Sequence, residues 1–140
     1  MECIVNWMGI EGMSFSAEVG SGHLVNMDGA PEAGGRNLAP RPMELLLAGA
    51  GGCTAFDVVM ILKKARQAIK GCQVKLSATR AEQDPKVFTH IHMTFIVSGH
   101  QLDPLRVSKA VALSHEKYCS ATIMLEKTAQ ITHSIEIVEK

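Results

Sequence analysis

The chain has 140 residues, which is enough for one compact domain over 1–140 and too few for two. Fourteen Lys and Arg residues balance fourteen Asp and Glu residues, and this formal charge of zero argues against nucleic acid or an anionic membrane as the main partner. One Trp, one Tyr and four Phe are too few aromatic side chains for a platform that stacks single-stranded nucleic acid.

The N-terminus and the cysteines both indicate a cytoplasmic protein. The first ten residues, MECIVNWMGI, contain no basic region followed by an apolar run, so no secretory signal is expected. The four cysteines form no CxxC pair, and in the cytosol most of them should be thiols. The most apolar window, 45–62, is interrupted by Asp57 and three glycines, so we expect a soluble protein rather than a membrane span.

The first forty residues predict three short strands followed by a loop. Side chains alternate along 3–7 as in a strand with one buried face, and 13–18 and 23–27 are two more short strands separated by a Gly-Ser-Gly turn. Residues 29–41 are rich in Gly, Pro and Ala and have no apolar period, so they predict a loop.

A long helix is predicted from Pro42 to Lys70. Proline suits the first helical position, cations gather near the end, and Gly71 just beyond suits a left-handed cap. These 29 residues would span about 43 Å, against a diameter of roughly 37 Å for a globule of this size. Because 45–62 is apolar almost all round, we expect a second copy of the chain to cover this helix in a homodimer.

The second half of the chain predicts a hairpin, two helices and a final strand, with Asp103 and Ser120 as helix N-caps. The expected elements are strand 73–80, turn 82–86, strand 87–97, helix 104–117, helix 120–127 and strand 131–137. The resulting order, βββ-α-ββ-α-α-β, is that of an α+β fold with mostly antiparallel sheets.

Cys53 follows three glycines in the segment AGAGGCTAF. Glycine inside a helix costs about 1 kcal/mol relative to alanine, so these glycines suggest a close backbone approach or a break in the helix. If the helix restarts at Cys53, free backbone N–H groups would stabilise its thiolate. Otherwise Cys53 is a small buried hydrophobe among small residues.

Cys119 lies between the second and third predicted helices, at a helix start before Ser120. A thiol there could pair with Cys53, but sequence spacing alone does not bring their Cα atoms within the about 7 Å that a disulfide requires. Cys3 and Cys72 lie at predicted strand starts, and we interpret them as core or edge residues.

The histidines offer weaker signals. His90 and His92 share one strand face, but the sequence suggests no third metal ligand, so a solvated or packed face is the preferred interpretation. His115, four residues before Cys119, could act as its base, although an exposed helix histidine is the simpler interpretation. We expect no bound metal or cofactor.

Two segments carry a family resemblance: RPMELLLAGAGGCTAFDVVMILKK at 41–64 and EKYCSATIMLEK at 116–127. Over nearly its whole length the chain resembles the OsmC/Ohr family of thiol-dependent peroxidases, and within it the YhfA-like branch. The resemblance implies an OsmC-like fold around a long central helix, in an intertwined homodimer.

The resemblance also implies a two-cysteine peroxidase that reduces organic, lipid-type hydroperoxides in oxidative-stress defence. Cys53 would be the peroxidatic thiolate and Cys119 the resolving thiol, so that a sulfenic acid on Cys53 condenses with Cys119 to a disulfide. An external dithiol of the dihydrolipoyl type, on a protein or a lipoyl group, would then reduce the disulfide.

Two positions depart from the family pattern. The family's active-site Glu directly follows the helix-opening Pro, where this chain has Met43, and Glu44 is displaced by one residue, about 100° around the helix. The activating Arg of the family belongs to the early hairpin loop, here 8–14, which contains no Arg. Arg36 and Arg41 lie in the next loop without matching the motif, and Glu44 and Arg36 are kept as weaker site candidates.

Asp57 lies at i+4 from Cys53, where its side chain leans back over the same helical turn. A carboxylate beside a thiol disfavours the thiolate. This position and the two departures support an alternative: the same fold, without catalysis, binding or sensing a small apolar or electrophilic ligand at the dimer interface.

Overall fold

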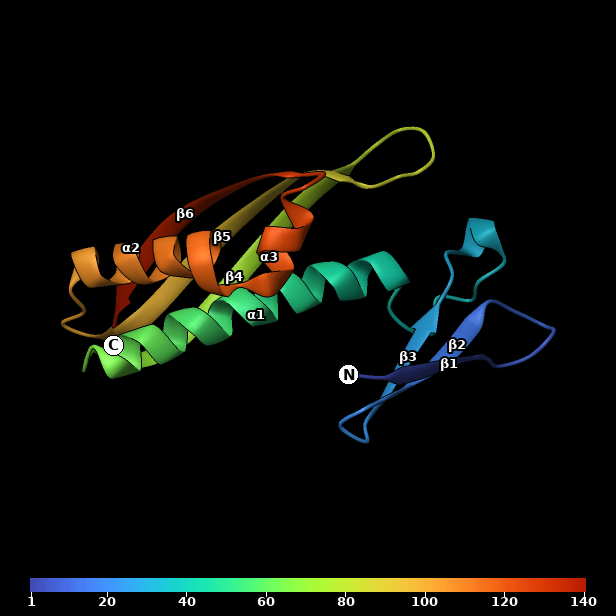
Figure 1. The fold of residues 1–140 in the computed structure, drawn as a ribbon, viewed down its shortest axis with the longest axis horizontal. Coiled ribbons are helices and arrows are strands. Elements are labelled where there is room, and N and C mark those ends of the chain that lie inside the picture. Colours follow the sequence, from blue (N-terminus) through green and yellow to red (C-terminus); the bar gives the residue numbers. More distant parts are fainter. The chain divides into compact units, whose positions relative to one another are not determined.

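The computed structural model describes all 140 residues, which form two compact units, Met1–Leu47 and Ala48–Lys140. The predicted order βββ-α-ββ-α-α-β is confirmed, with two short helical turns, η1 and η2, added to it. The elements in Figure 1 are β1 (Cys3–Trp7), β2 (Ser14–Val19), β3 (Leu24–Asp28), η1 (Pro31–Ala33), α1 (Pro42–Lys64), β4 (Ala68–Arg80), β5 (Phe88–His100), α2 (Pro104–Leu113), η2 (Ser114–Tyr118), α3 (Ser120–Leu125) and β6 (Gln130–Glu139).

The N-terminal unit is an antiparallel sheet in the order β1-β2-β3. Its strands lie within one residue of the predicted positions. The indole Nε1 of Trp7 donates a hydrogen bond to the carbonyl of Gly12 over 2.9 Å and so closes the loop between β1 and β2.

The loop 29–41 folds around the carboxylate of Asp28, the last residue of β3. This carboxylate accepts backbone hydrogen bonds from Gly29, Arg36 and Leu38 over 2.8, 3.1 and 3.0 Å. Gly35 lies directly against the backbone of Gly29, so that a Cβ at Gly35 would overlap it. The loop is therefore held in one conformation by backbone contacts rather than by an apolar core.

The C-terminal unit is a sheet in the order β4-β5-β6 with helices on one face (Figure 1). β4 and β5 pair antiparallel around the predicted turn, whereas β5 and β6 pair parallel across the connection formed by α2, η2 and α3. The buried side chains alternate along β5, as predicted, and are joined by side chains of α1 and α2. The largest fully buried apolar side chains of this core are Phe95, Leu62, Ile91, Val58, Val97, Val107 and Val111.

The end of α1 differs from the prediction, because the helix stops at Lys64 rather than Lys70. Arg66 adopts a left-handed conformation with φ 56°, its N–H donates to Lys63, and the N–H of Gln67 donates to Leu62. This pair of hydrogen bonds is a Schellman cap, formed here by Arg66 instead of the expected Gly71. The 23-residue helix is about 35 Å long.

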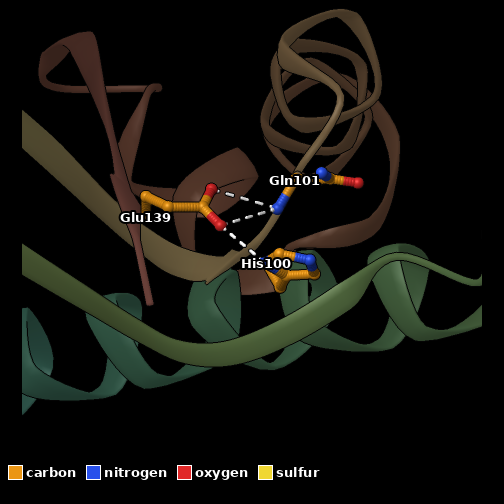
Figure 2. Close-up of polar contacts among 3 residues, drawn as sticks. All are labelled: His100, Gln101 and Glu139. Atoms are coloured by element: carbon orange, nitrogen blue, oxygen red, sulfur yellow. Dashed lines mark hydrogen bonds and ion pairs between the residues drawn. The ribbon is translucent and has the colours of Figure 1, made fainter.

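The last strand is fastened to the turn that follows β5 (Figure 2). The carboxylate of Glu139 accepts hydrogen bonds from His100 Nδ1 over 2.7 Å and from the backbone N–H of Gln101 over 3.0 and 3.2 Å. These hydrogen bonds hold the pKa of Glu139 below its ordinary value. The backbone N–H of Gln101 has the largest effect and His100 the next largest.

By length and composition alone, α1 is long and apolar enough to cross a membrane, a test that core helices of soluble proteins also pass. Its buried side chains include the polar residues Thr54 and Asp57, which face the packed interior of the C-terminal unit.

Candidate functional site

Two thiols and a carboxylate meet inside the C-terminal unit. Cys53 and Asp57 lie one turn apart on α1, and Cys119 precedes the first residue of α3. The sulfurs of Cys53 and Cys119 and a carboxylate oxygen of Asp57 all lie within 4.8 Å of one another. Cys53 is half-buried, whereas Cys119 has no exposed surface and Asp57 is 8% exposed.

The helix is continuous through Cys53, so of the two interpretations of the glycines, a close backbone approach or a break, the break is excluded. The residue therefore lies in a helix interior, where its N–H takes part in the helical hydrogen-bond ladder. Of the three preceding glycines, Gly51 provides the predicted close approach, because a Cβ there would lie 2.7 Å from Leu76 Cδ1 on β4. Gly49 and Gly52 have open space around them.

Cys119 does lie at a helix start, as predicted, but it is itself the N-cap, and Ser120 is the first helical residue. The helical turn η2 has π geometry and brings the N–H of Cys119 to the carbonyl of Ser114 over 2.8 Å. The sulfur of Cys119 accepts a hydrogen bond from the backbone N–H of Thr122 over 3.5 Å. The pKa of Cys119 is raised, mainly by burial. The neighbouring Cys53 thiol raises it further, whereas the hydrogen bonds from Thr122 lower it.

A buried chain of hydroxyl groups orients the Asp57 carboxylate. Ser114 Oγ donates to Asp57 Oδ2 over 3.0 Å, and Thr54 Oγ1 lies 2.8 Å from Ser114 Oγ. Since a hydroxyl has a single hydrogen, Thr54 is the donor of the second bond. Sequence reasoning identified Asp57 but missed Thr54 and Ser114, because no local pattern links a helix residue to a turn that lies 57 residues further along the chain.

The other two cysteines lie elsewhere. Cys3 begins β1 and is exposed, whereas Cys72 lies within β4 rather than at its start and is half-buried. Burial raises the pKa of Cys72.

The weaker candidates, Arg36 and Glu44, both belong to the N-terminal unit. The Arg36 guanidinium crosses the β1–β2 loop, where Nη2 donates to the carbonyl of Glu11 over 2.9 Å, and it lines a cavity of about 360 Å³. Glu44 accepts a hydrogen bond from the backbone N–H of Arg41 over 3.0 Å and thus caps the start of α1. Although the β1–β2 loop has no arginine of its own, Arg36 therefore supplies it with a guanidinium.

The histidines take part in polar and ring contacts. His92 contacts the hydroxyls of Thr132 and Ser134 over 2.7 and 3.1 Å on the exposed face of the sheet. His115 lies 6.2 Å from the ring of His133, centroid to centroid, and is half-buried rather than exposed. The pKa of His133 is lowered, mainly by burial and to a smaller extent by the neighbouring His115 and His92.

An apolar cavity of about 530 Å³ lies along the exposed side of α1. Two lysines at one end are its only charged side chains. The lining residues are Gly52, Ala55, Phe56, Val59, Met60, Lys63 and Lys64.

The chemistry available here is that of a thiol pair. All four cysteines are free thiols in this structure, and the sulfurs of Cys53 and Cys119 lie within 4.8 Å of each other, whereas an S–S bond is about 2.05 Å long. Cys53 is half-buried and Cys119 is fully buried, so an external oxidant reaches Cys53 first.

Comparisons with known proteins agree with one another. The sequence model described as OsmC-like protein matches residues 34–134. Protein YhfA of Escherichia coli K12 is 50% identical over 138 residues, which cover 99% of this chain and 98% of YhfA.

Solved structures share the fold. A hypothetical protein from Aquifex aeolicus VF5 is 28% identical, with a TM-score of 0.85 over 99% of this chain and 96% of that one. An organic hydroperoxide resistance protein OsmC from Legionella pneumophila is 17% identical, with a TM-score of 0.68 over 97% of each chain.

Proposed function

Since the chain belongs to the OsmC-like protein family, we propose that it is a two-cysteine thiol peroxidase that reduces organic, lipid-type hydroperoxides in oxidative-stress defence. The family resemblance expected from 41–64 and 116–127 is thereby confirmed. The observation that carries the proposal is the distance between two sulfurs: Cys53 and Cys119 lie within 4.8 Å, one accessible and one buried.

The reaction begins at Cys53. Its thiolate attacks the distal oxygen of the hydroperoxide, the O–O bond breaks, and the proximal oxygen leaves with a proton as an alcohol, so that Cys53 becomes a sulfenic acid. The Cys119 sulfur then attacks the Cys53 sulfur, and the sulfenic hydroxyl leaves as water with the thiol proton. An external dithiol of the dihydrolipoyl type exchanges with the disulfide and restores both thiols.

The surroundings of Cys53 support an organic substrate. The neighbouring residues Gly52 and Ala55 line the 530 Å³ cavity, and the remaining walls toward Val59 are apolar. Burial of an alkyl chain contributes about 0.8 kcal/mol per methylene, which hydrogen peroxide cannot gain.

Arg36 is the cation that we assign to this reaction, in place of an arginine in the β1–β2 loop. Its backbone N–H donates to Asp28 and its guanidinium donates to the carbonyl of Glu11, so it is held in place within the N-terminal unit. Glu44 remains the weaker candidate, because its carboxylate is already engaged at the start of α1.

Partners and location follow from the same proposal. The protein acts as a cytoplasmic homodimer in which α1 of each copy covers the other, and a dithiol protein or lipoyl group is its reductant. OsmC-like proteins are soluble, in keeping with this location.

The test is steady-state turnover of cumene hydroperoxide with dihydrolipoamide. We expect Cys53→Ser to abolish turnover, and Cys119→Ser to halt the reaction at a sulfenic acid that dimedone traps. Cys72→Ser, a half-buried cysteine outside the pair, is the matched control and should retain activity. After one equivalent of hydroperoxide, peptide mapping should find a Cys53–Cys119 disulfide with Cys3 and Cys72 reduced. Wild-type turnover no greater than that of Cys53→Ser would overturn the peroxidase.

The second candidate is a protein that binds or senses an apolar or electrophilic ligand without turnover. The apolar cavity along α1, lined by the sequence neighbours of Cys53, Gly52 and Ala55, favours it. In that case a fatty acid should raise the melting temperature, or an electrophile should modify Cys53 stoichiometrically, while cumene hydroperoxide is not turned over.

A further inference from the structure

A carboxylate, that of Asp57, lies next to the two thiols, and the peroxidase reaction does not use it. Cys53 and Asp57 occupy positions i and i+4 of α1, so they project from one face of the helix, and Cys119 approaches the same face from the start of α3. Two ligands one helical turn apart with a third from another element is a frequent arrangement in metal sites, as in the HExxH helix.

The distances fit a small ion. Three atoms no more than 4.8 Å apart have a common centre within about 2.8 Å of each. Zinc binds cysteine sulfur at about 2.3 Å and carboxylate oxygen at about 2.0–2.2 Å. The donors therefore need to move inward by less than about 1 Å each, which rotation of the side chains supplies.

The carboxylate is already oriented as a metal ligand would be. Ser114 donates to Asp57 Oδ2, and Thr54 donates to Ser114 in turn, so the carboxylate plane is fixed and its other oxygen is not used by this chain of bonds. Hydrogen bonds of this kind behind a ligand raise metal affinity by about 10- to 100-fold. Ser114 has no exposed surface, so water does not compete for the bond.

We propose that Cys53, Asp57 and Cys119 form a binding site for one thiophilic divalent cation of the zinc class. Two thiolates select against Mg²⁺ and Ca²⁺, which require oxygen ligands. Ion binding releases the two thiol protons, and a water molecule completes a four-coordinate site. The two thiolates and the carboxylate carry three negative charges, and the ion neutralises two of them.

Ion binding and disulfide formation exclude each other, because both use the same two sulfurs. Diamide, an azo oxidant, takes two electrons and two protons from the thiols, its N=N bond becomes a hydrazine, and the S–S bond forms. The oxidised protein then lacks both sulfur ligands.

The test uses Co²⁺ as a spectroscopic substitute for Zn²⁺, added to the reduced full-length protein without oxygen. We expect sulfur-to-cobalt charge-transfer absorption and the visible bands of tetrahedral Co²⁺, saturating at one ion per chain and abolished by Zn²⁺. Cys53→Ser and Cys119→Ser should each weaken the charge-transfer band, and Ser114→Ala should lower affinity by about 10- to 100-fold. Cys72→Ser, outside the cluster, should bind as the wild type does, and diamide should abolish binding.

A second measurement needs no variant. Zn²⁺ should protect Cys53 from iodoacetamide, while the exposed Cys3 reacts as before. Absence of charge transfer in the wild type, or equal binding by the Cys53→Ser/Cys119→Ser double variant, overturns the proposal, as does unprotected Cys53. Neither measurement includes peroxide or reductant, so an inactive peroxidase leaves both readouts unchanged.

Discussion

Asp28 shows how one side chain can organise a loop that has no core. Its carboxylate is 1% exposed and accepts three backbone hydrogen bonds, one of them from Arg36. These bonds hold the pKa of Asp28 below its ordinary value of 3.8. The bond from Leu38 lowers the pKa most, the bonds from Arg36 and Gly29 lower it less, and burial acts in the opposite direction. The position of the Arg36 guanidinium thus depends on an acidic residue eight positions earlier.

Asp28→Asn should lower the urea midpoint of unfolding at pH 7, because an amide carries no charge and turns an N–H₂ group toward backbone donors. The carboxylate stabilises the folded state fully above its unfolded pKa of about 3.9, and this contribution is lost as pH falls through the lower folded pKa. The gap between wild type and variant should therefore persist down to about pH 4 and close as the pH falls further. Glu18→Gln, on the exposed face of β2, is the control and should change the midpoint little at either pH. A gap that widens in acid would contradict this role of Asp28.

At the level of elements, the glycines of α1 divide into two kinds. Gly51 lies against Leu76 of β4, whereas Gly49 has nothing within 4 Å of an added Cβ. Close packing of the helix on the sheet therefore depends on one glycine of the run.

Gly49→Ala should raise the free energy of unfolding by about 1 kcal/mol, since alanine is the better helix former. Gly51→Ala gains the same propensity, but the methyl group overpacks against Leu76, which costs about 1–3 kcal/mol. Gly51→Ala should therefore be less stable than Gly49→Ala by that amount in urea unfolding. Equal stabilities would mean that Leu76 moves aside freely.

Local signals predicted the elements well and their junctions less well. Alternation and turn residues located the strands, and Asp103 with Pro104 located α2, whose N-cap is confirmed by the hydrogen bond from Leu105 to Asp103. The end of α1 was missed because Arg66, which has a Cβ, takes the left-handed conformation that the sequence assigns to glycine. The helical pattern predicted continuity through Cys53, and packing of α1 outweighs the poor helix propensity of the three glycines before it.

The candidate site was predicted in part. The flanking residues identified Cys53, Cys119 and Asp57 individually, and the i+4 spacing predicted that Asp57 lies beside Cys53. Two contacts complete the site: Cys53 lies near Cys119, and Ser114 donates to Asp57. Both depend on how α2, η2 and α3 return to the sheet. Such contacts are tertiary, so no sequence pattern contains them.

At the level of the whole molecule, the outer side of α1 carries large exposed apolar side chains. Phe56 is 67% exposed and Met60 38%, on a helix whose opposite side is buried in the C-terminal unit. Exposed apolar surface of this extent is typical of an interface.

We expect light scattering to give about 30 kDa, twice the chain mass of 15.1 kDa, at micromolar concentration. Phe56→Glu should shift the mass toward a single chain, because it buries an unpaired charge in the interface. Met124→Glu alters an equally exposed apolar side chain on α3 and should leave the mass unchanged. A wild-type mass near 15 kDa would rule out the dimer.

The parallel pairing of β5 with β6 also sets an order of events during synthesis. The connection that carries Cys119 begins at β5, and β6, which follows it in the chain, ties its far end to the sheet. A nascent chain consequently contains both cysteines before it contains the site, and its Cys53 is exposed to cellular oxidants without a neighbouring thiol to resolve it. A chain that ends at Thr128, before β6, would keep all four cysteines but lack the strand that fastens this connection to the sheet.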